Sequence, residues 1–232
     1  WRTRRRSGPW STPPDRVRSP SRSPSPRWSR WMDDRPVVLV IAGPTAAGKT
    51  AAALAAARAW DGIVVGADAM QVYRGMDIGT ATPTAEELGG VEHRGIDLVD
   101  PDQAFDAADF IAEADAAIAT GRPVIVAGGT GMYLQALVRG LVDTPPVDPE
   151  LRASLEADPD LHARLAAVDP VLAARLHPND RVRVIRGVEV HAQTGRQLSD
   201  LQAEHAARPD RVVAHGVFLD RDDLDARIDA RV

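Results

Sequence analysis

The sequence predicts an α/β fold in which helices flank a parallel sheet, with a helical insertion late in the chain. Short β-branched runs alternate with helical segments over residues 36–141. Two of these runs pass directly into glycine-rich turns that precede helices. Strand patterns then largely disappear between residues 142 and 209, where helical segments are separated by Asp-Pro and His-Pro-Asn-Asp breaks.

The first part of the chain alternates strands with helices. PVVLVIAG is a β-branched run typical of a buried parallel strand, and the alanine-rich KTAAALAAARAW is typical of a helix. GIVVGAD indicates a second strand, after which residues 69–90 are expected to be mostly loop because of their Gly, Thr and Pro content. An amphipathic helix ending before Gly121, a third strand in RPVIVAGGTG and a helix in MYLQALVRGL follow.

Four regions follow from this pattern. They are a disordered or spurious N-terminal extension (1–31), an α/β core (36–141), a helical insertion (142–209) and a return to the core (210–232). The return contains a strand in RVVAHGVFLD and the start of a helix in RDDLDARIDARV. Because the chain stops within that helix, we expect a truncated fragment. In the helix, Arg227 and Arg231 lie four residues apart on one face.

Charge is unevenly distributed along the chain. The net charge is −5, but residues 1–31 hold nine Arg and one Asp, or +8, so the remainder carries −5 − 8 = −13. This extension is either an RNA-binding or localisation tail or a misplaced translation start, and the first methionine at Met32 favours the second interpretation. With no cysteine, no apolar run of membrane-spanning length and no signal peptide, a cytoplasmic protein without membrane contact is expected. Nothing in the sequence demands an oligomer, so a monomer is expected.

The strongest motif is GPTAAGKT, which contains the only lysine of the chain, Lys49. It matches the P-loop pattern and has the required context, with an apolar strand before it and a helix after it. Backbone N–H groups of such a loop surround phosphate oxygens, the lysine neutralises the outer phosphate, and the Thr50 hydroxyl is placed to bind Mg²⁺. The alternative is an ordinary glycine-rich turn. The motif predicts a P-loop NTPase-like sheet and phosphate binding.

The nature of the phosphate ligand depends on where acids follow the strands. Ordinary NTPases carry an acid after a hydrophobic strand to help hold Mg²⁺, but the third strand here ends in glycine. The acid that does follow a strand is Asp68, which serves either as a base for an acceptor or as a turn cap. A small-molecule kinase that binds ATP and uses Asp68 as base, and a non-enzymatic nucleotide-binding module, therefore remain as alternatives to another group transfer.

Five blocks carry a resemblance to a known family. They are GPTAAGKT, DAMQVYRGMDIGTATP, DPDQAFDAADF, AGGTGMYLQALVRGL and VDPVLAARLHPNDRVRVIRGVEVHAQTGRQLS. In this order they resemble the tRNA dimethylallyltransferases, also called tRNA isopentenyltransferases, from residue 37 to the end of the chain. The second block and the HPND sequence within the last block are the most specific. The resemblance implies transfer of a dimethylallyl group from dimethylallyl diphosphate to N6 of an adenosine next to the tRNA anticodon.

The resemblance also assigns residues to roles. It implies that Asp68 is the catalytic base and that Thr45 and Arg231 act near the diphosphate. It implies that Mg²⁺ is bound at Thr50, that Gly128–Gly131 line the pocket, and that the diphosphate is held by Gly43, Pro44, Thr45, Ala46, Ala47, Gly48, Lys49 and Thr50. The segments matching tRNA-contacting parts of the family are Asp68, Ala69, Met70 and Gln71, and Arg181, Val182, Arg183, Val184 and Ile185.

A tRNA partner requires a local basic surface, because the chain beyond residue 31 is acidic. Such a stretch exists in the helical insertion at Arg181, Arg183, Arg186 and Arg196, and it is either a solvated helix face or a contact with the anticodon stem-loop. The family usually has Lys where Thr82 stands and Gln where Val182 stands, and both differences remove polar groups that could contact substrate. The six histidines show no metal-ligand spacing, so no metal beyond the substrate's Mg²⁺ is expected.

Overall fold

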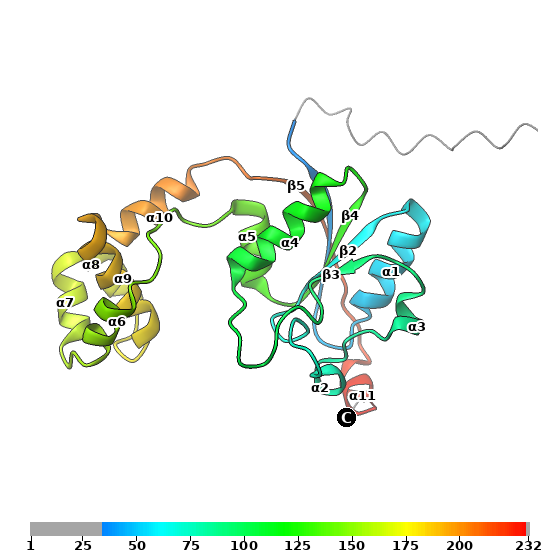
Figure 1. Ribbon diagram of the computed structural model, residues 1–232, viewed down its shortest axis with the longest axis horizontal. Coiled ribbons are helices and arrows are strands. Elements are labelled where there is room, and N and C mark those ends of the chain that lie inside the picture. The colour runs from blue at the N-terminus through cyan, green and yellow to red at the C-terminus, as the bar shows by residue number, and fades with distance from the viewer. Residues whose placement is uncertain (1–33, 231–232) are drawn as a thin grey trace, which may run out of the picture. The chain divides into compact units, whose positions relative to one another are not determined.

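The structure is a computed structural model that describes residues 34–230. Within this range the strands form one five-stranded sheet of order β3-β2-β4-β1-β5, and all its pairings are parallel (Figure 1). The strands are β1 (Val37–Ala42), β2 (Ile63–Ala67), β3 (His93–Arg94), β4 (Val124–Gly128) and β5 (Val213–Phe218). The parallel α/β fold predicted from the sequence is confirmed. The predicted extension 1–31 and Arg231 lie outside the described residues.

Helices cover both faces of the sheet because side chains of each strand alternate between the two faces. On one face Val38, Val65 and Val126 pack against α4 (Ala107–Ala119) and α5 (Gly131–Arg139), whose largest buried side chains are Phe110 and Tyr133. The two rings stack with centroids 4.7 Å apart. The side chains of the other face pack against α1 (Lys49–Trp60) in a second cluster. Helix α4 ends before Gly121, as predicted.

The segment predicted to be loop contains more structure than the sequence indicated. Two one-turn helices, α2 (Asp77–Thr80) and α3 (Ala85–Leu88), lie within it, and β3 follows and pairs with β2. A reciprocal pair of hydrogen bonds between Thr84 and Glu87 caps α3. Elements of two to four residues are too short to show periodicity, which explains why the sequence pattern does not reveal them.

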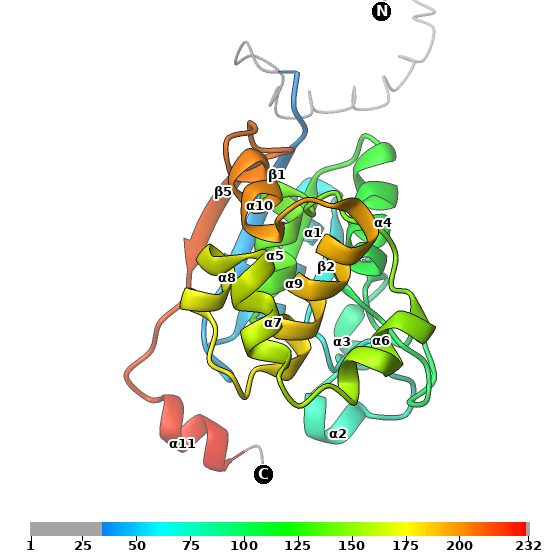
Figure 2. The ribbon, with the colours of Figure 1, turned by 90° about the vertical axis from the view of Figure 1, so that its left-hand side faces the viewer.

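The predicted insertion is helical and has a core of its own. It comprises α6 (Pro149–Glu156), α7 (Leu161–Val168), α8 (Pro170–Arg175), α9 (Arg181–Thr194) and α10 (Leu198–Ala206). Leu155, Leu165 and Val188 are among the buried residues of this cluster. Figure 2 shows α7, α8, α9 and α10 packed side by side. The boundaries at residues 142 and 209 stay a prediction. No helix among residues 34–230 is long and apolar enough to cross a membrane.

Two buried carboxylates hold these helices together. Asp169, at the break between α7 and α8, accepts hydrogen bonds from the Leu172 N–H (2.9 Å), the Ser199 N–H (2.8 Å) and the Ser199 hydroxyl (2.7 Å). Glu189, on α9, accepts from Arg186 at 2.6 Å and from the Asp148 N–H at 3.2 Å. Each buried acid is thus paired inside the helical cluster, as buried charges require.

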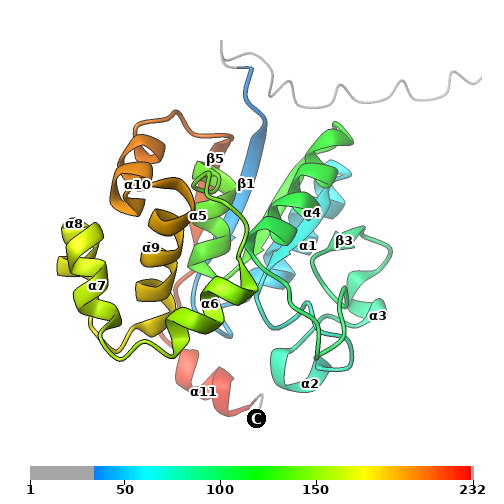
Figure 3. The same ribbon diagram turned by 60° about the vertical axis from the view of Figure 1, so that its left-hand side comes forward.

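The end of the chain returns to the sheet. Strand β5 pairs with β1 along its whole length but exposes most of its side chains. A short helix, α11 (Leu224–Asp229), follows it and lies at the end of the sheet where β1 ends (Figure 3). This return places Arg227 near the glycine-rich loop after β1.

Replacing Asp169 by Asn is expected to make the helical cluster less stable and less sensitive to acid. Burial raises the pKa of Asp169, but the hydrogen bonds from Ser199 and Leu172 outweigh it and hold the pKa below the usual value. A lowered pKa stabilises the fold above the unfolded-state value of about 4, and this stabilisation is lost as the pH falls through the folded-state pKa. Asp169→Asn should cost about 1–3 kcal/mol at pH 7, because its amide group faces the Ser199 donors.

Urea unfolding followed by circular dichroism at pH 7 and pH 3 measures this effect. The difference in unfolding free energy between wild type and Asp169→Asn should shrink at the lower pH. The matched control is Asp160→Asn, an exposed position at the opposite end of α7, which should change stability little at either pH. A difference that is the same at both pH values would show that the Asp169 charge does not contribute.

Candidate functional site

The site lies where three neighbouring strands end. In a parallel sheet the loops that follow adjacent strands meet at the carboxyl edge. The order β2-β4-β1 therefore brings together the loops that start at Asp68, Gly129 and Gly43. A Cβ atom at Gly129 would lie 3.8 Å from the Gly43 carbonyl oxygen, so the two glycine-rich turns are neighbours. This juxtaposition is the one that the sequence predicts.

The loop after β1 is wound for phosphate binding. Gly43, Ala46 and Gly48 all have positive φ, at 152°, 65° and 94°, and Gly48 directly precedes α1. Positive φ at these positions is typical of an anion-binding loop, and this loop ends at a helix N-terminus. The Lys49 ammonium group donates to the Pro44 carbonyl at 2.8 Å and thus lies across the loop. Thr45 is exposed at its tip.

A second segment of the chain supports this loop from the carboxyl end of β5. The Leu219 N–H donates to the Ala42 carbonyl at 2.8 Å, and a Cβ atom at Gly43 would lie 2.4 Å from the Leu219 carbonyl oxygen. Only glycine fits there. Farther along, the Arg227 Nε donates to the Ala46 carbonyl at 2.8 Å. The family resemblance gives a role to Arg231, which lies outside the described residues, and the sequence places Arg227 one helical turn before it. Within the described residues it is Arg227 that contacts the loop.

Asp68 begins the loop after β2. Its Oδ1 accepts a hydrogen bond from the Met70 N–H at 2.9 Å, so the turn-cap alternative describes its contact in this structure. One carboxylate oxygen is used in that bond, and a carboxylate has further acceptor capacity on both oxygens. The cap therefore orients Asp68 without excluding a second role. Asp68 is half-buried at the edge of the sheet.

Thr130, in the second glycine-rich turn, fixes the loop that carries Asp68. Its hydroxyl accepts from the Ala69 N–H at 3.0 Å, and its own N–H donates to the Ala67 carbonyl at 3.0 Å. The two bonds grip the backbone on both sides of Asp68. The family resemblance implies that Gly128–Gly131 line the pocket but gives Thr130 no individual role, because a threonine after Gly-Gly has no pattern that distinguishes it from an ordinary helix cap.

Side-chain hydrogen bonds hold the rest of the loop that follows Asp68. The Gln71 side-chain amide donates to the carbonyl oxygens of Thr80 and Ala81 at 3.0 and 3.1 Å. Thr82, where the family usually has Lys, makes a hydroxyl–hydroxyl contact of 2.9 Å with Thr80. At this position the chain thus has a neutral, short side chain that contacts its own loop. Met70 is exposed beside Asp68.

Two titratable side chains beneath the loops have displaced pKa values. Burial lowers the pKa of His93 to about 4, so this imidazole is neutral at physiological pH. Burial also raises the pKa of Tyr133, and nearby Tyr73, Asp106, Asp109 and Asp68 raise it further. Both groups are therefore uncharged at neutral pH.

No cluster of three or more metal-ligating side chains occurs within residues 34–230. The Thr50 hydroxyl, half-buried in the first turn of α1, supplies one oxygen donor. Mg²⁺ prefers several oxygen ligands and commonly takes them from water and substrate phosphates. The donor set thus fits an ion that arrives with a phosphate ligand.

The predicted tRNA-contacting stretch on α9 divides into exposed and buried side chains. Arg181, Val182 and Arg183 are exposed, Val182 to 72%. Val184 and Ile185 are instead buried in the helical core, so their side chains hold α9 in place and cannot face an RNA. Helical periodicity explains this correction, since five consecutive residues of a helix cannot share one face.

The other two arginines of the predicted basic surface also have structural partners. Arg186 donates to Glu189, to the Thr144 hydroxyl and to the Pro145 carbonyl, so it anchors the start of the insertion. Arg196 pairs with Glu204. Arg181 donates to the Glu156 carbonyl at 2.7 Å and Arg183 pairs with Asp180, but both side chains are exposed on α9.

The comparison with known families agrees with the geometry. A family model described as IPP transferase matches residues 71–232. The chain belongs to the IPP transferase family. It is 55% identical over 207 residues to the tRNA dimethylallyltransferase of Anaeromyxobacter dehalogenans strain 2CP-C, a match that covers 84% of this chain and 69% of that protein. It is 51% identical over 212 residues to tRNA dimethylallyltransferase 1 of Syntrophotalea carbinolica, which it covers to 68%.

Solved structures of IPP transferase relatives have the same fold. A eukaryotic dimethylallyltransferase acting on tRNA superposes with a TM-score of 0.76 at 32% identity, covering 84% of this chain and 52% of that one. The full-length tRNA isopentenylpyrophosphate transferase of Bacillus halodurans gives a TM-score of 0.53 at 37% identity and is covered to 64%. The family resemblance and the P-loop NTPase-like fold are confirmed, and this chain spans about half the length of the eukaryotic enzyme.

Gly128→Ala is expected to disrupt the site. A Cβ atom at Gly128 would lie 2.0 Å from the Ala67 carbonyl oxygen, so β2 and β4 would have to separate just before Asp68. We expect a loss of about 1–3 kcal/mol or more in unfolding free energy. Thermal melting and calorimetric titration with inorganic diphosphate measure stability and phosphate binding.

Gly131→Ala is the matched control for Gly128→Ala. Nothing lies within 4 Å of a Cβ atom at Gly131, which begins α5. Alanine there should be neutral or slightly stabilising, because it favours the helix. Equal effects of the two substitutions would rule out the steric explanation.

Proposed function

We propose that this chain transfers a dimethylallyl group from dimethylallyl diphosphate to N6 of an adenosine next to a tRNA anticodon. A carbon–oxygen bond of the donor breaks and a carbon–nitrogen bond to N6 forms. The diphosphate leaves, and the exocyclic amine loses one proton. The proposal rests on family membership and on one geometric observation: a phosphate-binding loop and a carboxylate start from strands on either side of the same central strand, β4.

The leaving group determines what the loop after β1 must do. As the carbon–oxygen bond breaks, negative charge develops on the diphosphate. Backbone N–H groups of the loop and of the first turn of α1, together with the Lys49 ammonium group, stabilise that charge where it develops. Arg227, which contacts the Ala46 carbonyl, keeps the loop in its wound conformation. Mg²⁺ bound at Thr50 would add further charge neutralisation of the phosphates.

The acceptor determines what the loop after β2 must do. An exocyclic adenine amine is a weak nucleophile, so a base that takes its proton assists the attack. Asp68 is the proposed base: its turn bond to Met70 orients the carboxylate and leaves acceptor capacity for the N6 proton. Thr130 acts through Asp68 as a positioning residue, since it grips the backbone on both sides of it.

An RNA partner requires an unstacked adenosine and contacts to the phosphate backbone. Base-modifying enzymes generally take their target base out of its stack. We propose that Arg181, Val182 and Arg183 on α9 face the anticodon stem-loop, while Asp68–Gln71 contact the target nucleotide. A cytoplasmic location and a monomeric state belong to the same proposal.

One incubation separates this reaction from the kinase alternative. The chain, and a longer form with the full length of its relatives, is mixed with an anticodon stem-loop. Dimethylallyl diphosphate and ATP are offered separately, and nucleosides are analysed by mass spectrometry after digestion. Dimethylallyladenosine formed without ATP supports the proposal. ATP turnover without prenylated adenosine would exclude it in favour of a kinase.

Lys49→Ala should reduce the rate with the diphosphate donor by roughly two or more decades, as for loss of a charge contact made in the transition state. Single-turnover prenylation at saturating RNA measures this. Arg58→Ala, at the far end of the same helix, is the control, and it should leave the rate within a factor of two or so of wild type. An unchanged rate for Lys49→Ala would contradict the role of the loop.

Asp68→Asn tests the base separately from the turn. Asparagine can still accept the Met70 N–H, so the loop should keep its shape while proton acceptance is lost. We expect a fall of about 10²–10⁴ in kcat with little change in diphosphate affinity. The exposed Asp61→Asn serves as control. If Asp68→Asn raised only KM, Asp68 would have a binding role and no role in proton transfer.

A further inference from the structure

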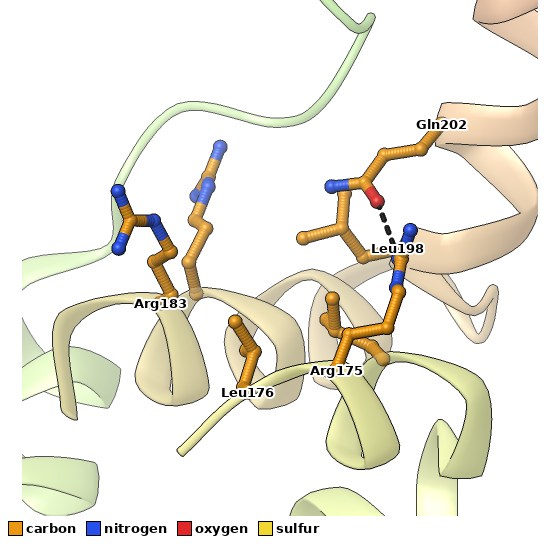
Figure 4. Close-up of a pocket in the computed structure, with 7 residues that line it drawn as sticks. Arg175, Leu176, Arg183, Leu198 and Gln202 are labelled. Carbon is orange, nitrogen blue, oxygen red and sulfur yellow. Dashed lines mark hydrogen bonds between the residues drawn. The ribbon is translucent and has the colours of Figure 1, made fainter. Parts of the chain in front are cut away.

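The helical insertion contains a pocket that lies mostly outside the α9 segment assigned to tRNA. Its volume is about 430 Å³, within the size range of small-ligand sites. Leu176 and Leu198 contribute apolar walls, and the polar lining comes from Arg175, Arg183, Arg186 and Gln202. Figure 4 shows Arg175 and Arg183 extending from their helices on either side of Leu176. An apolar floor between guanidinium groups matches the chemistry of a nucleotide, which has a flat base and an anionic phosphate.

Positive charge remains in this pocket chiefly at Arg175, because Arg186 is paired with the buried Glu189 and Arg183 pairs with Asp180. The Asp169 carboxylate is buried beneath α8 and accepts from Leu172 and Ser199. Glu189 is buried and bonds to Arg186 and Arg152. Both acids are thus directed into the helical core, whereas the side chains of Arg175 and Arg183 reach the surface.

A phosphate can readily replace the present hydrogen-bond partners of Arg175 and Arg183. Arg175 donates to the neutral Gln202 oxygen at 2.8 Å, so a phosphate takes over this donor without breaking a direct ion pair. Arg183 pairs with Asp180 three residues earlier, but 73% of the Arg183 side chain is exposed. Exposed pairs of this kind contribute little stability and exchange readily.

We infer that this pocket binds one nucleotide of the RNA substrate other than the reacting adenosine. Its phosphate lies on Arg175 and Arg183, and its base lies against Leu176 and Leu198 with Gln202 at its edge. The inference rests on the proposed function, because it takes tRNA as the partner. It adds to that function a subsite on α8 and α10, built on Arg175 and Gln202, which contributes affinity and registers the RNA.

Arg175→Gln is the first test. Binding of a fluorescent anticodon stem-loop is measured by anisotropy between 50 and 200 mM salt. Loss of one charged phosphate contact should weaken binding on the order of tenfold and reduce the slope of log affinity against log salt by about 0.7. Arg164→Gln, an exposed arginine on α7 outside the pocket, is the matched control and should change neither quantity appreciably. Arg164→Gln should also leave prenylation at saturating RNA near wild type.

Gln202→Glu is a second variant that separates a loss of RNA binding from a loss of folding. It keeps the shape and the bond to Arg175 but adds a carboxylate that repels phosphate, so RNA binding should weaken while the melting temperature is retained. Single methylphosphonates placed through the RNA loop then locate the contact. At one position the neutral linkage should weaken wild type but not Arg175→Gln, which a double-mutant cycle reports as coupling.

The outcomes separate this inference from the proposed function. If Arg175→Gln matches Arg164→Gln while wild type binds and prenylates RNA, the subsite is wrong and the function stands. If every methylphosphonate is additive with Arg175→Gln, the arginine acts through a diffuse field and the subsite is likewise wrong. If wild type neither binds nor prenylates RNA, the proposed function fails and the subsite fails with it.

Discussion

The site depends on the close approach of β2 and β4 at their carboxyl ends. Gly128 lies so near the Ala67 carbonyl that a single added methyl group would overlap it, at 2.0 Å. This contact allows the Thr130 N–H and hydroxyl to reach the backbone around Asp68. Because β4 lies between β2 and β1, the same turn also adjoins the start of the phosphate-binding loop at Gly43. One glycine thus couples the placement of a carboxylate to that of a phosphate site.

This arrangement separates the two charges that the proposed chemistry creates. A proton and a diphosphate both leave the reacting centre, and each needs a partner that does not neutralise the other. Asp68 follows β2 and Lys49 lies in the segment that follows β1, and these two strands flank β4. The Lys49 side chain is directed across its own loop toward Pro44. Tyr133, whose pKa is raised by burial and by nearby acids that include Asp68, is uncharged at neutral pH.

The sequence predicts the parts of this fold that repeat a pattern over many residues. Strands β1, β2 and β4 are β-branched runs with buried side chains, and the loop after β1 has fixed spacing, so both follow from local residues. The sequence pattern does not reveal strand β3, because only two residues form it and they pair with β2 through backbone atoms alone. The role of Thr130 and the contact of Arg227 cannot be predicted from local sequence, because they join residues far apart in the chain. The predicted tRNA-contacting segment on α9 is continuous and includes Val184 and Ile185, but helical geometry turns these two side chains inward.

The helical insertion shows how an acidic chain can present a basic surface. Its buried carboxylates, Asp169 and Glu189, are fully hydrogen-bonded within the core and serve to join helices. Burial there withdraws negative charge from the surface, and the low dielectric strengthens each bond that compensates for desolvation. Arginines at the ends of α8 and α9 remain outside, where water screens them until an anion displaces it. Net charge therefore says little about nucleic-acid binding in this chain; what matters is which carboxylates fold inward and which arginines do not.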